Sequence, residues 1–223
     1  MTKTLERRYT TAGFEYRASG DRTPGTMRGY ALKWDRLSQN LGGFVERVAP
    51  GAVNLGDGSD VLARYNHEDD YLLGRTSSGT LRLSVDDIGL VYEVDLPDTT
   101  AGRDVAVLME RGDVSQSSFA FYVPPDGDSW STTEEGFPLR TLRQIQLVDV
   151  APVNTPAYLD TEAGLRSLAE SRGVDLDVVR RAAADNDLAA IVTPPAPQPL
   201  PAPTAAARLR AYSARRPLDY YRR

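Results

Sequence analysis

Residues 112–123 read GDVSQSSFAFYV. Side chains of a strand alternate between two faces, so Phe119 and Phe121 share an apolar face and Ser118 lies on the opposite one. We therefore predict a core strand here, with a hydroxyl held on a rigid element. Such a hydroxyl suits a nucleophile, but a serine nucleophile needs a base that accepts its proton.

The chain contains one histidine, His67, within the sequence RYNHEDDYLLGRT at residues 64–76. Imidazole is the ordinary general base near neutral pH. We therefore expect the fold to bring His67 against Ser118. The alternative roles are structural: a solvated loop histidine, and a strand serine that bonds to a neighbour.

A third group must orient the imidazole, and three carboxylates are candidates. Asp149 lies in the apolar run LVDV at residues 147–150, whereas Glu68 and Asp69 directly follow the histidine. Neighbours on an extended backbone point to opposite faces, so Glu68 is badly placed to reach the ring. We favour Asp149; its alternative role is to bond the turn that follows its strand.

Two arginines lie upstream of this carboxylate. Arg140 and Arg143 could hold an oxyanion or a substrate carboxylate, but the interpretation that we favour is a pair of exposed strand arginines. The acidic pairs at residues 86–87 and 134–135 are typical of solvated turns.

The composition is that of one soluble domain. The chain has 223 residues, of which 41% are hydrophobic and 26% are charged, so we expect one main domain with a real core. Its apolar runs are too short to cross a bilayer, so no membrane partner is expected. The first residues lack the apolar segment of a signal peptide, so export is not expected.

Residue counts exclude several kinds of chemistry. The chain has no cysteine, which removes cysteine nucleophiles, disulfides and thiolate zinc sites, and one histidine cannot build a histidine-rich metal centre. We therefore expect no metal and no cofactor, and chemistry by oxygen nucleophiles or carboxylates. The net charge of -5 argues against a general attraction to nucleic acid.

Alternating apolar and polar positions make the first half of the chain a predicted β meander. A helix is predicted from Thr99 or Thr100, either of which can cap it, to Gly112, which suits a C-terminal cap. The serine strand follows, and after it a polar loop at residues 124–136 and a long strand at residues 139–150.

The pattern becomes helical near residue 160, with a second helix predicted over residues 175–191. From residue 193 the sequence is rich in proline and alanine and then in arginine and tyrosine, which predicts an extended linker and a basic tail. The tail suits docking on an acidic surface, and binding of nucleic acid is the weaker alternative because the body of the chain is acidic. We therefore divide the chain into a main domain at residues 1–170, a C-terminal helix at 171–192 and the linker with its tail at 193–223.

Six segments carry a resemblance to a known family. They read GYA at 29–31, FVERVAPGA at 44–52, NHE at 66–68 with LGRT at 73–76, SFAF at 118–121, DVAPV at 149–153 and PA at 156–157. In this order they resemble the prohead (capsid maturation) protease family of tailed bacteriophages. The resemblance extends from about Arg17 to Leu168.

This resemblance implies a serine endopeptidase with a mainly β fold and flanking helices (α+β), in a closed or partly open β-barrel like that of the herpesvirus assemblin-type proteases. It implies a location inside the immature capsid, or prohead, in the host cytoplasm. The implied substrates are the scaffold segment of the major capsid protein and the protease itself. It leaves a homo-oligomer open and implies no cofactor.

The resemblance also implies three catalytic residues. His67 matches the histidine of the family's NH-acidic and LGR pattern, Ser118 matches the serine of its S-F-G-F strand, and Asp149 matches the carboxylate of its E-V-S strand. The chain departs from the pattern where it has Ala120 for glycine, aspartate at 149 for glutamate, and Ala151 for serine. The competing hypothesis is a non-catalytic capsid assembly or scaffolding factor with the same barrel.

Overall fold

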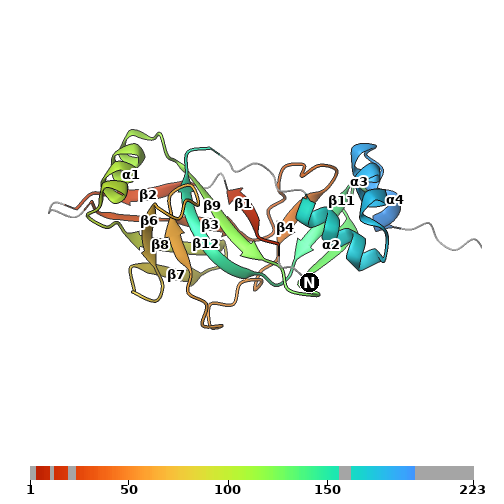
Figure 1. Ribbon diagram of the computed structural model, residues 1–223, viewed down its shortest axis with the longest axis horizontal. Helices are drawn as coiled ribbons and strands as arrows, with labels where there is room; N and C mark the ends of the chain where they lie inside the picture. The colour runs from red at the N-terminus through yellow and green to blue at the C-terminus, as the bar shows by residue number, and fades with distance from the viewer. Residues whose placement is uncertain (1–3, 11–12, 20–23, 156–161, 194–223) are drawn as a thin grey trace, which may run out of the picture.

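The computed structural model describes residues 4–10, 13–19, 24–155 and 162–193 (Figure 1). The strands in these ranges are β1 (Glu6–Thr10), β2 (Phe14–Arg17), β3 (Thr26–Lys33), β4 (Val45–Val48), β5 (Leu62–Arg64), β6 (Leu72–Arg75), β7 (Leu81–Val85), β8 (Gly89–Asp95), β9 (Gln116–Tyr122), β10 (Asp128–Thr132), β11 (Pro138–Leu142) and β12 (Gln146–Val153). The helices are α1 (Thr100–Arg111), α2 (Glu162–Arg172), α3 (Leu176–Ala184) and α4 (Leu188–Val192). The chain is therefore mainly β with some helices, as predicted.

The strands form three sheets. A five-stranded sheet has the order β1-β9-β12-β5-β6, a four-stranded sheet has the order β2-β3-β8-β7, and a three-stranded sheet has the order β10-β11-β4. A closed barrel requires the two edge strands of a sheet to pair. Among the described strands, the edge strands β1 and β6 of the five-stranded sheet do not pair with each other, so the sheets are not closed into a barrel. The predicted closed or partly open barrel of the assemblin type is therefore not confirmed.

The main hydrophobic core lies between the five-stranded and four-stranded sheets. Phe119 and Phe121 of β9 belong to it, and their rings stack with centroids 5.2 Å apart. The predicted apolar face of this strand is therefore confirmed. Burial of such aromatic side chains holds β9 rigidly in the middle of the molecule.

Helix α1 begins and ends where the sequence predicts. The Thr99 hydroxyl accepts a hydrogen bond from the Gly102 backbone N–H, which caps the N-terminus. Gly112 follows the helix in the left-handed region, with φ of 82°, which glycine adopts without a steric cost. This turn leads the chain into β9.

The second half of the chain differs from its prediction in three places. The long strand expected at 139–150 is two strands, β11 and β12, which belong to different sheets. The loop expected at 124–136 contains β10, which pairs with β11. The helix expected at 175–191 is divided into α3 and α4, because Asn186 between them has φ of 56° and a right-handed helix cannot continue through that conformation.

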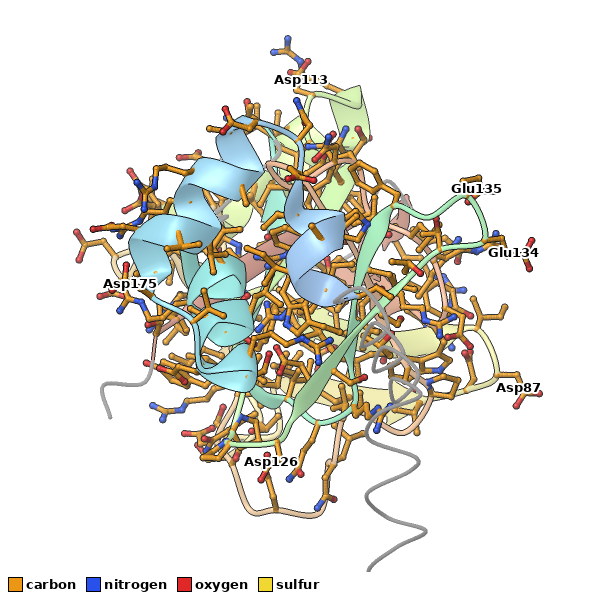
Figure 2. All side chains as sticks on the ribbon, turned by 90° about the vertical axis from the view of Figure 1, so that its right-hand side faces the viewer. Asp87, Asp113, Asp126, Glu134, Glu135 and Asp175 are labelled. Carbon is orange, nitrogen blue, oxygen red and sulfur yellow. The ribbon has the colours of Figure 1, made fainter. Side chains whose placement is uncertain are left out.

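Helices α2, α3 and α4 form one end of the molecule, opposite α1 (Figure 1). They enclose a second hydrophobic cluster, in which Leu168 and Val179 pack with Phe44 and Trp130. Apart from Thr193, the predicted linker and tail lie outside the described residues. Figure 2 views this end and shows Asp87, Glu134 and Glu135 projecting from the rim, as predicted for solvated turns.

Candidate active site

The five-stranded sheet brings the three predicted residues to adjacent strands. Ser118 lies on β9, opposite Ala151 of β12, and Asp149 lies on β12 itself. The next strand in the order is β5, and the chain reaches His67 three residues after β5 ends. The order β9-β12-β5 therefore places the serine, the carboxylate and the histidine side by side.

The side chains of these residues form a continuous chain of hydrogen bonds. The Nε2 atom of His67 is 2.6 Å from the Ser118 Oγ atom, and Nδ1 is 2.5 Å from Oδ1 of Asp149. All three residues are buried. A hydroxyl, an imidazole and a carboxylate in this order can pass a proton from the hydroxyl to the ring, while the carboxylate stabilises the charged ring.

A β-bulge turns Asp149 toward the histidine. The pairing of β12 with β9 shifts register between Leu147 and Asp149, so Val148 is an extra residue. In a strand of regular alternation, Leu147 and Asp149 would lie on the same face. The bulge allows Leu147 and Val150 to enter the core while Asp149 faces the other side.

The backbone at the histidine adopts an unusual conformation. Asn66 has φ of 55° and His67 has φ of 61°, and such left-handed conformations cost about 1–2 kcal/mol for each non-glycine residue. Asn66 is held by its N–H, which donates to the Pro152 carbonyl at 3.1 Å, and by its side-chain oxygen, which accepts from the Asn154 N–H at 3.2 Å. The end of β12 thus fixes the turn that aims the imidazole.

Arg64 is a neighbour of the site that the sequence did not predict. Its Nη1 atom donates to Oδ2 of Asp149 at 3.1 Å, and its Nη2 atom lies 3.1 Å from Oδ1 of Asp69. Both oxygens of Asp149 are therefore bonded, one to the imidazole and one to Arg64. Among the three candidate carboxylates, Asp149 is the one that contacts His67, while Asp69 pairs with Arg64.

The two neighbouring serines of β9 have different surroundings. Ser117 lies on the core side, where its Oγ is 2.8 Å from the hydroxyl of Tyr92. Burial raises the pKa of Tyr92, and the bond to Ser117 only partly offsets this effect. Ser118, on the opposite face, is the serine in contact with His67.

Strand β1 covers the serine. Tyr9 pairs with Ser118 across the antiparallel ladder of β1 and β9, and the Ser118 hydroxyl donates to the Arg8 carbonyl at 2.9 Å. The exposed fraction of Ser118 is 0%. In this conformation the hydroxyl is closed off from solvent.

A group of charged side chains, which we call the ionic cluster, lies on the other side of β1 and β9; four of its members are buried and Asp128 is partly buried. Its members are Glu6, Arg8, Glu46, Asp128 and Arg140. Arg140 is 1% exposed, so the expectation of an exposed strand arginine is wrong for this residue. Burial by itself lowers the pKa of Arg140, but Glu46 and Glu6 outweigh burial and raise its pKa above that of free arginine.

The described residues contain no group of three or more histidine, aspartate or glutamate side chains that could hold a metal ion. No helix in the described ranges is long and apolar enough to span a membrane.

Residues 13–173 match the family model of the caudovirus prohead serine protease. This match includes His67, Ser118 and Asp149 but begins after β1. The chain has no match among curated proteins or among solved structures. The family predicted from the sequence motifs is therefore confirmed.

Proposed function

Because the chain belongs to the family of caudovirus prohead serine proteases, we propose that Ser118, His67 and Asp149 are the catalytic residues of a serine endopeptidase. The observation that supports this proposal most strongly is the hydrogen-bonded chain from Asp149 through His67 to Ser118. The alternating burial of β9, the bulge of β12 and the left-handed turn at His67 all contribute to it.

The proposed mechanism gives each of the three side chains one role. The Ser118 Oγ attacks the carbonyl carbon of the scissile peptide bond, and its proton passes to Nε2 of His67. As the C–N bond breaks, His67 returns this proton to the leaving amine. Asp149 accepts the Nδ1–H and stabilises the imidazolium. Water then attacks the acyl group and gives a proton to His67, which passes it to the Ser118 Oγ as the acyl–Oγ bond breaks and the new carboxyl end is released.

We further propose that the substrate is the scaffold segment of the major capsid protein, with the protease itself as a second substrate. This part of the proposal follows from the family, whose members are proteases of the immature capsid. It would place the protein inside the prohead, in the host cytoplasm.

A second candidate is a non-catalytic assembly or scaffolding factor of the capsid. The complete burial of Ser118 favours it, because a nucleophile that no substrate reaches does no chemistry. The two candidates differ in what happens to the capsid protein.

Co-expression with the major capsid protein, followed by mass spectrometry of both proteins, tests the proposal. The wild-type chain should shorten the capsid protein, and Ser118→Ala should leave it at full length while shells still assemble. Ser117→Ala is the matched control, because it removes a neighbouring hydroxyl that contacts Tyr92 rather than His67. Trimming that continues in Ser118→Ala would exclude Ser118 as the nucleophile. Assembly without any trimming of the capsid protein by the wild-type chain would favour the scaffolding role.

A further inference from the structure

One edge of β9 must open if a peptide is to reach Ser118. Peptidases commonly bind their substrates as extended strands that pair with an edge of a sheet. In this protein both edges of β9 are occupied, one by β12 and the other by β1. Since β12 carries Asp149, opening its side would dismantle the site, so the edge covered by β1 is the one that a substrate can use.

Strand β1 can leave more readily than any other strand beside the site. Within the described part of the chain it is the terminal strand of its sheet and pairs with β9 alone. A cavity of about 540 Å³ lies against it, lined by Tyr9 from β1, by Lys33 at the end of β3 and by Arg36 beyond that strand. It also precedes residues 13–173, which match the family model.

The backbone of β1 occupies the space beside the Ser118 hydroxyl that a substrate must enter. The Arg8 carbonyl oxygen is 2.9 Å from the Ser118 Oγ, which is the side on which a substrate carbonyl must approach. A serine hydroxyl has one proton, so it cannot donate to the Arg8 carbonyl and to His67 at the same time. A docked β1 therefore holds the hydroxyl proton away from the base.

The side chains of β1 are anchored in the ionic cluster. Arg8 donates from Nε to Glu46 at 2.9 Å, and its guanidinium lies 5.8 Å from the ring centroid of Phe121. Glu6 accepts two hydrogen bonds from Arg140, at 2.7 and 3.0 Å. Such charge-assisted bonds are the strong ones in proteins, so they hold β1 on β9.

The members of the ionic cluster outside β1 determine which peptides can take the place of this strand. Strand β1 contributes one acidic and one basic side chain to the ionic cluster, Glu6 and Arg8. The other members, Glu46, Asp128 and Arg140, belong to other strands and together carry an excess of one negative charge. An arginine or lysine at the position of Arg8 would neutralise this excess. An acidic residue there would add a second unpaired negative charge in a buried place.

We propose that β1 is a built-in pseudosubstrate strand, which blocks Ser118 until it is displaced by an extended peptide with a basic residue immediately before the cleaved bond. This inference rests on the proposed peptidase function and adds to it a substrate preference and a mode of inhibition. The displacing peptide pairs with β9 in the register that β1 now has, with its scissile carbonyl at the position of the Arg8 carbonyl.

Weakening the anchor of β1 tests the inhibition. In Arg8→Ala, Glu6 and Glu46 keep their bonds to Arg140, but β1 loses its own bonds to Glu46. The fraction of open molecules should rise, and kcat/KM for a fluorogenic peptide with arginine before the cleaved bond should rise at least about tenfold. Arg7→Ala, an exposed change on the same strand, is the matched control and should match the wild type.

A second fluorogenic peptide, with glutamate instead of arginine before the cleaved bond, tests the substrate preference. It should be cleaved at least about tenfold more slowly by Arg8→Ala. Equal rates for the two peptides would overturn the assigned preference. An unchanged rate in a folded Arg8→Ala variant would overturn the inhibition.

If Arg8→Ala does not fold, the inhibition can be tested with a disulfide that ties β1 to β9. Arg7 and Ala120 are paired across the ladder, and the chain has no other cysteine, so Arg7→Cys with Ala120→Cys can be oxidised to lock β1 on β9. The oxidised protein should be inactive and regain activity on reduction. Equal activity of the two forms would show that β1 need not leave.

Hydrogen exchange separates this inference from the proposed peptidase function. In Ser118→Ala, which cannot form an acyl-enzyme, the arginine peptide should increase exchange of the β1 amides and leave that of β12 unchanged. This result would support displacement even if no cleavage were found with the wild-type protein. Unchanged exchange of β1 at a saturating peptide concentration would overturn the inference.

Discussion

Two buried polar groups flank β9, and they differ in what their protons can do. In the ionic cluster, each of the five charged residues has at least two polar partners, and none of its groups must change charge. In the site of Ser118, His67 and Asp149, the hydroxyl has two competing acceptors and the imidazole can gain or lose a proton.

This difference separates a structural role from a chemical one. Burial and short hydrogen bonds are common to both groups, so neither feature by itself indicates catalysis. What distinguishes the second group is a proton that can move along a line of partners. The ionic cluster instead fixes β1, β4, β10 and β11 against one another, because its charges come from all four strands.

The largest effect that tests this difference is the loss of peptide hydrolysis expected from Asp149→Asn. The amide keeps the shape of the carboxylate but cannot stabilise the imidazolium, so peptide hydrolysis should fall by about 10³–10⁴. The variant should stay folded, with a thermal midpoint close to that of the wild type. Steady-state hydrolysis and thermal melting measure the two effects.

The control for this change is Asp69→Asn. Asp69 pairs with Arg64, as Asp149 does, but it does not contact the histidine, so its variant should keep a rate close to that of the wild type. A rate for Asp149→Asn close to that of Asp69→Asn would contradict the proposed role of Asp149.

The next effect concerns stability and tests the ionic cluster. Arg140→Met leaves Glu6, Glu46 and Asp128 without their shared partner in a buried place, so the free energy of unfolding should fall by about 3–5 kcal/mol. Urea denaturation measures this loss. Arg143→Met, an exposed change just beyond β11, should alter stability by no more than about 0.5 kcal/mol. Similar losses in both variants would mean that the cluster does not stabilise the fold.

The smallest effect concerns Asp60, an exposed carboxylate just before the hairpin of β5 and β6, whose loop carries His67. Hydrogen bonds from Arg75, and then from the Ser77 backbone N–H, hold the pKa of Asp60 well below its usual range. Because the pKa is lower in the folded state, this contribution to stability is complete above the usual aspartate pKa of about 4 and is lost as the pH falls below it.

Asp60→Asn should therefore lower the thermal midpoint at pH 7 and make less difference at pH 3. Asp70→Asn, an exposed change in the loop between β5 and β6, is the control. A difference between wild type and Asp60→Asn that does not depend on pH would show that the charge of Asp60 contributes nothing.

Local signals in the sequence predicted the serine, the histidine and the ends of the helix that precedes the serine strand. Alternation placed Phe119 and Phe121 in the core and Ser118 on the opposite face, and a single histidine left one candidate base. The caps of α1 at Thr99 and Gly112 also follow from residue type, because the side-chain oxygen of one and the left-handed backbone of the other act within a single turn.

The sequence alone determined which residues could do chemistry, since residue type and period are properties of neighbouring positions. Tertiary structure decided what surrounds them. The fold brings together residues that are far apart in the sequence. Arg64 and Asp149 are 85 positions apart, Arg140 and Glu6 are 134 apart, and Ser118 and Arg8 are 110 apart. No local pattern records such contacts, because they depend on which strands pair and in which register.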